Sequence, residues 1–509
     1  MSALGDRNLA AQAERSQALK GDYEALLFEG TWYRSGELFE RSRRLGGGIS
    51  ELGIGPGERV IVTMGNSEQV GIAYQGLWRA GTVVTPANFL LSAEDLRHVI
   101  ADAEASAVIT TPEFADKVRD ATEGLGHVRH RISTGEVDGF QSLADVCTAA
   151  PAEIVPRADD DLAALLYTGG TTGRSKGVML THANLAYTGE AAHRSSHVPG
   201  LNRGILSLPL SHAYGLLVTI AGLFNPEQGI AVLLRWFDPT LYLEMIAEHR
   251  IQLAAAVPTM LQVLLSQPLE DYDLRSLQFV SSGGAPLAQD VADQFVKRVP
   301  SVTIRQGYGL TETAALISST PVGREKPGAV GLPVPGTEVR ILDDDGGELP
   351  AGEVGEICAR SPGVMRGYWR SPKTTAEALR DGWLHTGDLG YLDDEGYLFI
   401  VDRKKDLIIR GGFNVYPRDV EDALLEHPAI ESAGVVGRPD PVSGEEVVAF
   451  VSLRPGAELS PEELVDWARG RIGGYKYPRE VHVVDAVPLT NVGKVDRKAL
   501  RAQFAVIPS

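Results

Sequence analysis

The chain has 509 residues, of which 43% are hydrophobic, and a formal net charge of -19 at pH 7. That length can hold roughly three or four domains with sizeable cores. The acidic balance, without any basic block, excludes nucleic acid and anionic membrane surfaces as good partners. The cysteines, Cys147 and Cys358, lie far apart and without histidines at metal spacing, which excludes a disulfide framework and a thiolate zinc site. We expect both to be packing residues in a reducing compartment.

The ends and the most apolar region of the chain carry no membrane signal. Residues 1–20 are polar and lack the apolar stretch of a secretory signal peptide. The most apolar region, 214–237, is interrupted by Asn225-Pro226-Glu227-Gln228, so no run reaches the roughly 18 to 20 apolar residues of a membrane helix. We therefore expect a cytoplasmic protein without membrane insertion.

Short β-branched runs alternate with helical patterns over the first 330 or so residues. The apolar spacing predicts helices over 69–80, ending at Gly81, and from Ser92 onward. Strands are predicted at 59–64, 82–85, 107–110, 251–257, 277–281 and 302–304. This alternation is typical of the α/β class, and we predict a large domain with parallel αβαβα-type sheets, covered by helices on both faces.

The sequence pattern changes after about residue 330. From there Gly, Pro and Asp separate short predicted strands, which indicates a β-rich subdomain over about 330–402. From Asp406 on, strands and helices alternate again. The predicted elements are strands at 407–409 and 447–453, a helix over 417–426 and a helix capped by Ser460 with Glu463. We predict a large domain over 1–404 and a small α+β domain over 405–509. The charged run Arg403 to Asp406, at this junction, is predicted to be solvated.

A glycine- and hydroxyl-rich turn, Thr168 to Gly177, ends in Lys176 between two apolar runs. Such a turn offers backbone N–H groups, hydroxyls and an ammonium to one small volume, which suits a polyphosphate. It is not a Walker A loop, because Lys176 follows Ser175 and precedes Gly177. By itself it could equally be a flexible surface turn.

Three later segments place polar side chains where a nucleotide could use them. Tyr308 to Thr313 follows a predicted strand and offers an aromatic face and the Glu312 carboxylate, which could hold Mg²⁺ or simply start a helix. Trp383 to Asp388 places an acid in a turn, suited to the vicinal hydroxyls of a ribose. Lys494 lies on a glycine turn, although lone surface lysines are usually only solubilising.

Taken together, these motifs resemble the adenylate-forming superfamily of acyl-CoA synthetases, aryl-CoA ligases, luciferases and peptide-synthetase adenylation domains. The resemblance covers nearly the whole chain, and the motifs stand in the family's order. They are Thr168 to Gly177, His212 to Gly215, Ser282 to Pro286, Tyr308 to Thr313, Gly387-Asp388, Asp402-Arg403, Gly411 to Pro417 and Gly493-Lys494. Each motif is weak alone, but their common order leaves little room for coincidence.

The resemblance implies an ATP-dependent acid–thiol ligase that uses ATP, Mg²⁺ and coenzyme A, and it assigns roles to particular residues. Lys494, Lys176 and His212 would be catalytic, and Glu312 with Thr168 would hold the metal. The residues implied in ATP or AMP binding are Thr168, Thr171, Thr172, Gly283, Gly284, Ala285, Tyr308, Thr313, Asp388 and Arg403. These roles fit the electrostatics of the reaction, because a carboxylate can attack an anionic phosphate only when cations neutralise both groups.

The resemblance also implies a second half-reaction, in which a small mobile domain swings about a hinge at Lys405 and a tunnel for coenzyme A forms at Gly411 and Gly412. The implied acyl pocket contains His212, Tyr214, Gly283 and Gly307. In dicarboxylate-specific members an arginine typically stands where this chain has Gly307. We therefore expect a neutral, fairly large acid, namely a medium or long fatty acid, an aryl acid or a bulky polycyclic acid.

The chain departs from the family's pattern at Ser175, where most members have proline, and at Gly169, where serine is usual. Both changes remove backbone restraint from the loop. An enzyme proficient mainly in thioester formation is therefore an alternative. A ligase that passes the acyl group to a carrier protein and a non-catalytic nucleotide-binding protein are two others. The sequence does not fix the oligomeric state, and a homodimer is one alternative.

Overall fold

The computed structural model describes residues 3–168, 175–472, 474–490 and 494–503, and within these the chain forms two compact units. Unit 1 comprises residues 1–338 and 359–384, and unit 2 comprises 339–358 and 385–509. The predicted domain boundary at residue 404 stays a prediction. Among the described residues, no helix is both long and apolar enough to cross a bilayer.

The first sheet of unit 1 has eight strands in the described residues. In spatial order they are β19 (Gly367–Tyr368), β9 (Lys176–Thr181), β8 (Leu162–Thr168), β4 (Val83–Pro86), β3 (Arg59–Thr63), β5 (Ala107–Thr110), β6 (His130–Ser133) and β7 (Gln141–Ser142). The pairs from β8 through β4, β3, β5 and β6 to β7 are parallel, as predicted, whereas β8 pairs antiparallel with β9. The sheet is therefore parallel as expected except at its β9 edge, where the β8–β9 and β9–β19 pairs are antiparallel.

The second sheet of unit 1 has nine strands in the described residues. In spatial order they are β16 (Leu332–Pro333), β15 (Ser318–Ser319), β14 (Thr303–Tyr308), β13 (Phe279–Ser282), β12 (Leu253–Ala256), β10 (Arg203–Leu206), β11 (Ile230–Leu233), β1 (Glu24–Phe28) and β2 (Thr31–Arg34). Strands β14, β13, β12, β10, β11 and β1 are parallel to their neighbours along this run. Their carboxyl ends therefore meet at one edge, where open α/β sheets bind ligands.

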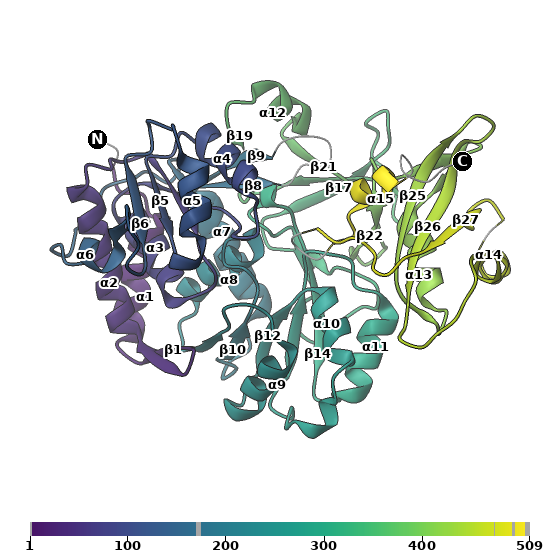
Figure 1. Ribbon diagram of the computed structural model, residues 1–509, viewed down its shortest axis with the longest axis horizontal. Helices are drawn as coiled ribbons and strands as arrows, with labels where there is room; N and C mark the ends of the chain where they lie inside the picture. Colours follow the sequence, from purple (N-terminus) through teal and green to yellow (C-terminus); the bar gives the residue numbers. More distant parts are fainter. Residues whose placement is uncertain (1–2, 169–174, 473, 491–493, 504–509) are drawn as a thin grey trace. The chain divides into compact units, whose positions relative to one another are not determined.

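Helices fill three layers around these two sheets, which confirms the predicted αβαβα arrangement (Figure 1). The layer between the sheets contains α1 (Leu9–Lys20), α2 (Ser35–Glu51), α3 (Glu68–Arg79), α7 (His182–Ser196) and α8 (Ala213–Phe224). The outer helices are α4 (Ala93–Asp102) and α5 (Ala115–Thr122) on the eight-stranded sheet, with α9 (Pro239–Glu248), α10 (Pro258–Leu265) and α11 (Gln289–Arg298) on the other. Ile61 packs outward while Val60 and Val62 pack inward, so the two-residue period of a strand builds both cores.

Local signals placed several helices correctly. The Ser92 side chain caps α4 by accepting from the Asp95 N–H, and Gly81, just after α3, has φ +73°. Ser460 and Glu463 form the predicted capping box of α14 (Pro461–Arg469). These residues satisfy backbone groups that every helix end leaves open, so their effect is local and readable from sequence.

Unit 2 contains a β-rich part and an α+β part. The first is a sheet built around β17 (Glu338–Leu342), β18 (Gly355–Arg360), β21 (Trp383–Leu392) and β22 (Leu398–Arg403). The second is a sheet of β24 (Phe413–Val415), β23 (Ile408–Arg410), β26 (Gly444–Leu453), β25 (Ile430–Asp440) and β27 (Glu480–Val483). Helices α13 (Pro417–Leu425) and α14 pack in one core of this second sheet and α15 (Arg497–Gln503) in another, so the predicted α+β character is confirmed.

Candidate active site

The predicted phosphate loop lies between two directly paired residues. Thr168 ends β8 and Lys176 begins β9, and the two are register partners. Paired residues of neighbouring strands project on the same face, so the Thr168 and Lys176 side chains share one face of the sheet. The Ser175 carbonyl oxygen meets His98 Nε2 at 3.0 Å. Thr171 and Thr172 lie outside the described residues, so their assignment stays a prediction.

A tyrosine that the sequence analysis missed joins Lys176 to Glu312. Strand β19 pairs antiparallel with β9, which sets Tyr368 opposite Val178. The Tyr368 hydroxyl donates a 2.8 Å hydrogen bond to Glu312 Oε1, and Lys176 Nζ lies 5.4 Å from the centre of the Tyr368 ring. Burial, reinforced by the Glu312 carboxylate, raises the pKa of Tyr368, so the phenol remains a donor. A two-residue strand has no periodicity that could have revealed this position.

Glu312 is held by a strained turn at the end of β14. It lies in a short 3-10 helix, Thr311–Thr313, and its carbonyl accepts a 2.8 Å hydrogen bond from the Met365 N–H. Ala314 and Ala315 follow with φ of +49° and +74°. Left-handed alanines cost energy and persist where surrounding structure imposes them, often at functional sites. The carboxylate is therefore presented by a rigid turn.

Thr313 has a structural contact in this turn. It is fully buried, and its hydroxyl accepts from the Leu310 N–H at 3.0 Å while bonding to the Leu310 carbonyl at 3.0 Å. Its hydroxyl is thus engaged by the backbone. The assignment of Thr313 to ATP or AMP binding stays a prediction.

The residues predicted to frame adenine follow neighbouring parallel strands. Strand β13 ends at Ser282, directly before Gly283, Gly284 and Ala285, and β14 ends at Tyr308. Gly284 has φ +81°, a conformation that favours glycine. Since β13 and β14 pair in parallel, these segments leave the same edge of the sheet side by side.

The predicted acyl-pocket residues also come together. A side chain added at Gly283 would approach the Gly307 carbonyl at 3.3 Å and Tyr214 Cε1 at 3.5 Å. His212 caps α8, and its Nδ1 accepts from the Tyr214 N–H at 3.3 Å. The Tyr214 hydroxyl donates to the Ser281 carbonyl at 2.9 Å. Two glycines thus lie beside an anchored aromatic ring. The assignment of these residues to an acyl pocket stays a prediction.

In unit 2, the predicted ribose-binding residues form an ion pair. Asp388 on β21 and Arg403 on β22 are register partners, and Arg403 Nε lies 3.1 Å from Asp388 Oδ1. The Asp388 side chain is 8% exposed against 40% for Arg403. Glu356 supports the turn before Asp388, because it accepts from the Gly387 N–H at 3.2 Å and lies 3.4 Å from Lys404 Nζ. The ion pair fixes the orientation of the Asp388 carboxylate. The assignment of both residues to ribose binding stays a prediction.

The predicted hinge segment is less solvated than expected. Lys404 and Lys405 are exposed, but Asp406 is buried and forms a 3.0 Å ion pair with Arg501 of α15. The expectation of a fully solvated charged run was therefore wrong at Asp406, since the ion pair compensates its burial. Desolvation lowers the pKa of Lys405, with the nearby Arg403 as the next cause.

The remaining predicted residues of unit 2 lie on tight turns. Gly411 and Gly412 have φ of +57° and +81°, and, apart from their chain neighbours, no described atom lies within 4 Å of where a side chain would begin. The Lys494 N–H donates to Thr490 Oγ1 at 3.2 Å, and its carbonyl accepts from the Thr490 N–H at 2.7 Å. The backbone of Lys494 is thus held at both its polar groups.

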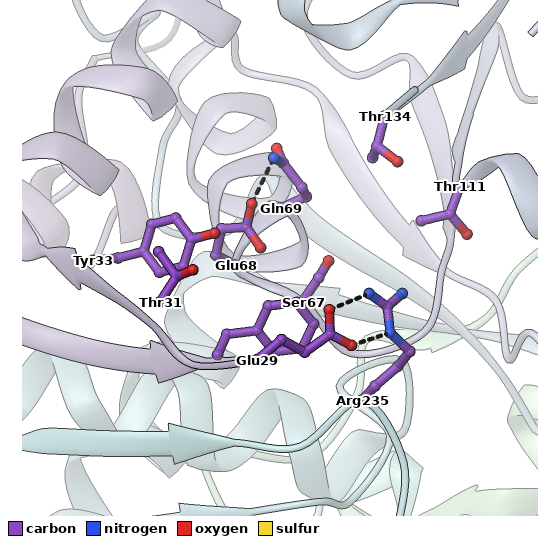
Figure 2. A pocket seen from close by; sticks show the side chains of 10 residues that line it. Glu29, Thr31, Tyr33, Ser67, Glu68, Gln69, Thr111, Thr134 and Arg235 are labelled. Atoms are coloured by element: carbon purple, nitrogen blue, oxygen red, sulfur yellow. Dashed lines mark hydrogen bonds and ion pairs between the residues drawn. The ribbon is translucent and has the colours of Figure 1, made fainter. Parts of the chain in front are cut away.

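A cavity of about 300 Å³ in unit 1 shares no residue with the predicted site. Figure 2 shows its polar lining, drawn from the β1–β2 hairpin, the amino end of α3 and the segments after β5 and β6. Its Arg235 is paired with Glu29 by hydrogen bonds of 2.7 and 3.0 Å. The site predicted from sequence and this cavity are therefore separate features of unit 1.

The five-layer unit, the hairpin loop ending in Lys176 and the Glu312 turn define the class of adenylate-forming ligases. A solved structure of ATP-bound MatB from Rhodopseudomonas palustris is similar to this chain, with a TM-score of 0.89 and 33% identity over 98% of this chain and 99% of that one. The chain belongs to the AMP-binding enzyme family. The family model for the AMP-binding enzyme matches residues 13–369, and the model for its C-terminal domain matches residues 419–494.

Two characterised relatives are similar over almost the whole chain. A feruloyl-CoA synthase from an Amycolatopsis species is 37% identical over 505 residues, which cover 98% of this chain and 100% of that protein. A long-chain-fatty-acid–CoA ligase from Escherichia coli O6:H1 is 36% identical over 534 residues, with 97% and 94% covered. The chain is therefore an ATP-dependent, AMP-forming acid–thiol ligase, and the expectation of ATP, Mg²⁺ and coenzyme A is confirmed for its family.

Proposed function

We propose that this ligase activates a neutral, fairly large carboxylic acid, fatty or aromatic, as an acyl adenylate and transfers the acyl group to coenzyme A. The observation that carries the proposal is the meeting of Tyr214, Gly283 and Gly307 in unit 1, which also holds the Lys176–Tyr368–Glu312 arrangement. The names of the two relatives, a feruloyl-CoA synthase and a long-chain-fatty-acid–CoA ligase, support an acid of this size.

The donor set of unit 1 suits a magnesium-bound triphosphate. Mg²⁺ prefers carboxylate and hydroxyl oxygens and keeps several waters, so Glu312 and Thr168 would hold it. When bound, the metal neutralises charge on the phosphates. Lys176 supplies a second positive charge, and Tyr368 fixes the Glu312 carboxylate in one orientation. These residues lower the repulsion between the acid's carboxylate and the phosphate that it attacks.

Residues of unit 2 have proposed roles in both half-reactions. Asp388, oriented by Arg403, would accept hydrogen bonds from the ribose hydroxyls. Lys494 would neutralise charge between the attacking carboxylate and the phosphate during adenylate formation. Rotation about Lys405 would then withdraw Lys494 and present Gly411 and Gly412 to the pantetheine arm. We further propose that the enzyme works in the cytoplasm. We also propose a homodimer as its oligomeric state.

The test is to measure the two half-reactions separately over a panel of acids. Pyrophosphate exchange reports adenylate formation, and thioester detection with coenzyme A or a holo-carrier protein reports transfer. We expect exchange with medium or long fatty acids or aryl acids and transfer to coenzyme A. Preference for malonate, or transfer only to the carrier protein, would contradict the proposed substrate or acceptor. Thioester formation from supplied adenylate without exchange would identify an enzyme limited to the second step.

A further inference from the structure

Strand β14 carries a buried arginine that the nucleotide-binding assignments do not use. Arg305 is 3% exposed and lies two residues before Gly307, on the same face of the strand. Both terminal guanidinium nitrogens donate long, 3.4 Å hydrogen bonds to the Ser196 carbonyl, and the guanidinium carbon lies 4.8 Å from the Phe279 ring centre. The charge is thus enclosed with few polar contacts.

The hydrogen-bonding capacity of Arg305 is not used up. Its Nε is buried without a hydrogen-bond partner among the described residues. None of the ion pairs found among the described residues involves Arg305, although the Glu325 carboxylate acts on it from farther away. Burying a guanidinium without an anionic partner lowers the stability of the fold. Such a group is therefore expected where a ligand can supply the missing hydrogen-bond acceptor.

Strand register places Arg305 one step along the sheet from the glycines of the predicted acyl pocket, because it stands two residues before Gly307 on β14. Arg305 is the register partner of Ser281 on β13, and Tyr214 donates its 2.9 Å hydrogen bond to the Ser281 carbonyl. The ring of the same tyrosine lies 3.5 Å from where a side chain at Gly283 would begin. The Tyr214 ring therefore spans from the glycine level of the pocket to the level of Arg305.

We propose that Arg305 determines substrate specificity, by requiring a hydrogen-bond-accepting oxygen at the end of the acid distant from its reacting carboxylate. This inference rests on the proposed function and narrows its substrate class. Guanidinium has five donors and no acceptor, so only an acceptor can satisfy it. A site built to hydrogen-bond a substrate group discriminates strongly against analogues that lack it, because the buried donor is then left unpaired.

A purely structural role predicts something different. Ser196 is the last residue of α7, and a cation there stabilises the helix through its exposed carbonyls. If that were the whole role, a substitution would lower stability and affect all acids equally. Specificity for a distal oxygen is a readout that a structural role would not change.

The experiment compares matched acids on the full-length enzyme. Octanoate, 8-hydroxyoctanoate and octanedioate have the same chain length, and cinnamate, 4-hydroxycinnamate and 4-carboxycinnamate form a second series. We expect kcat/KM for adenylate formation to favour an oxygen-bearing member over its hydrocarbon by at least about tenfold in one series. The hydroxyl and carboxylate members distinguish a neutral acceptor from an anionic one.

The decisive variant is Arg305→Met, which keeps an unbranched chain and removes every donor. We expect it to reduce the preference to within about threefold, mainly through KM, while the hydrocarbon acid is activated as well as by the wild type. Arg305→Lys, which keeps a charge, should retain part of the preference. The matched control is Arg203→Met, since Arg203 also donates to a helix-end carbonyl, that of His249 at 2.8 Å. It should leave the preference intact.

The outcomes separate this inference from the function on which it rests. If no acid of either series supports pyrophosphate exchange, the proposed function fails. If acids are activated but the wild type prefers the hydrocarbon members, or Arg305→Met and Arg203→Met change selectivity alike, the specificity role alone is overturned. Should Arg305→Met fail to fold, the wild-type preference and Arg305→Lys still decide the question.

Discussion

The Tyr368 hydroxyl donates a 2.8 Å hydrogen bond to Glu312, and the same ring lies under the Lys176 ammonium at 5.4 Å. The Tyr368 side chain thus contacts both charged groups that we propose for triphosphate binding, the Glu312 carboxylate and the Lys176 ammonium. Each strand or turn involved is short, yet the geometry is fixed because β19 pairs with β9. This relationship makes Tyr368 a positioning residue rather than a phosphate ligand.

Tyr368→Phe should weaken the use of magnesium-bound ATP. A hydrogen bond to a charged group contributes about 1.5 to 3 kcal/mol, so we expect kcat/KM for ATP to fall about tenfold or more. Because the ring remains, melting temperature should change little. Titration of Mg²⁺ at fixed ATP measures the effect, and Tyr187→Phe, which loses a 2.7 Å bond to the Pro335 carbonyl, is the control. Equal losses in both variants would contradict the positioning role.

Lys494→Ala should separate the two half-reactions. Loss of one charge-stabilising donor in a transition state costs two to three orders of magnitude, so pyrophosphate exchange should slow by roughly that factor. Thioester formation from supplied acyl adenylate should change little. Lys498→Ala, at an exposed position four residues later, should leave both steps unaffected. Equal slowing of both steps in the Lys494 variant would refute the proposed hinge mechanism.

Gly307→Arg should shorten the acyl pocket without unfolding the protein. A side chain at this position begins 3.5 Å from the Ser318 carbonyl, an ordinary contact, and Gly307 does not have a left-handed φ. A long arginine would then fill space beside Gly283 and Tyr214. We expect kcat/KM for long acids to fall at least about tenfold, the scale of steric and polar mismatch in a pocket. Gly307→Ala is the control, and an unchanged acid profile for Gly307→Arg would place the pocket elsewhere.

His182 should make the stability of unit 1 depend on pH. It is 1% exposed, its Nδ1 accepts from the Leu9 N–H at 3.2 Å, and burial, followed by Arg157, lowers its pKa to about 4. The unfolded chain, with a histidine pKa near 6.5, binds the proton more tightly. Stability is therefore complete above about pH 6.5 and falls towards pH 4, by up to about 3 kcal/mol.

Denaturant unfolding of the wild type and of His182→Gln between pH 4 and pH 7 measures this effect. The variant should show a flatter pH dependence, whatever its absolute stability. His130→Gln, which alters a histidine that meets Gln141 at the surface, should keep the wild-type slope. If the unfolding free energy of His182→Gln depends on pH as steeply as that of the wild type, other groups cause the acid sensitivity.

The sequence by itself determined the α/β class, the βαβ alternation and the positions of several strands and helices. These follow from local physics: the two-residue and 3.6-residue periods, the cap at Ser92 and the capping box at Ser460 each act within a few residues. The motif order also identifies the adenylate-forming class, and the family resemblance groups Tyr214, Gly283 and Gly307, which lie close together in the structure.

Only the tertiary structure decided which distant side chains meet. Tyr368 reaches Glu312 because two short strands pair across almost two hundred residues of chain, and no local pattern encodes that register. Arg305 is charged in sequence, but its burial beside Ser281 depends on the parallel pairing of β13 with β14. Long-range register is set by the packing of whole sheets and helices, and the chemistry of these two residues follows from it.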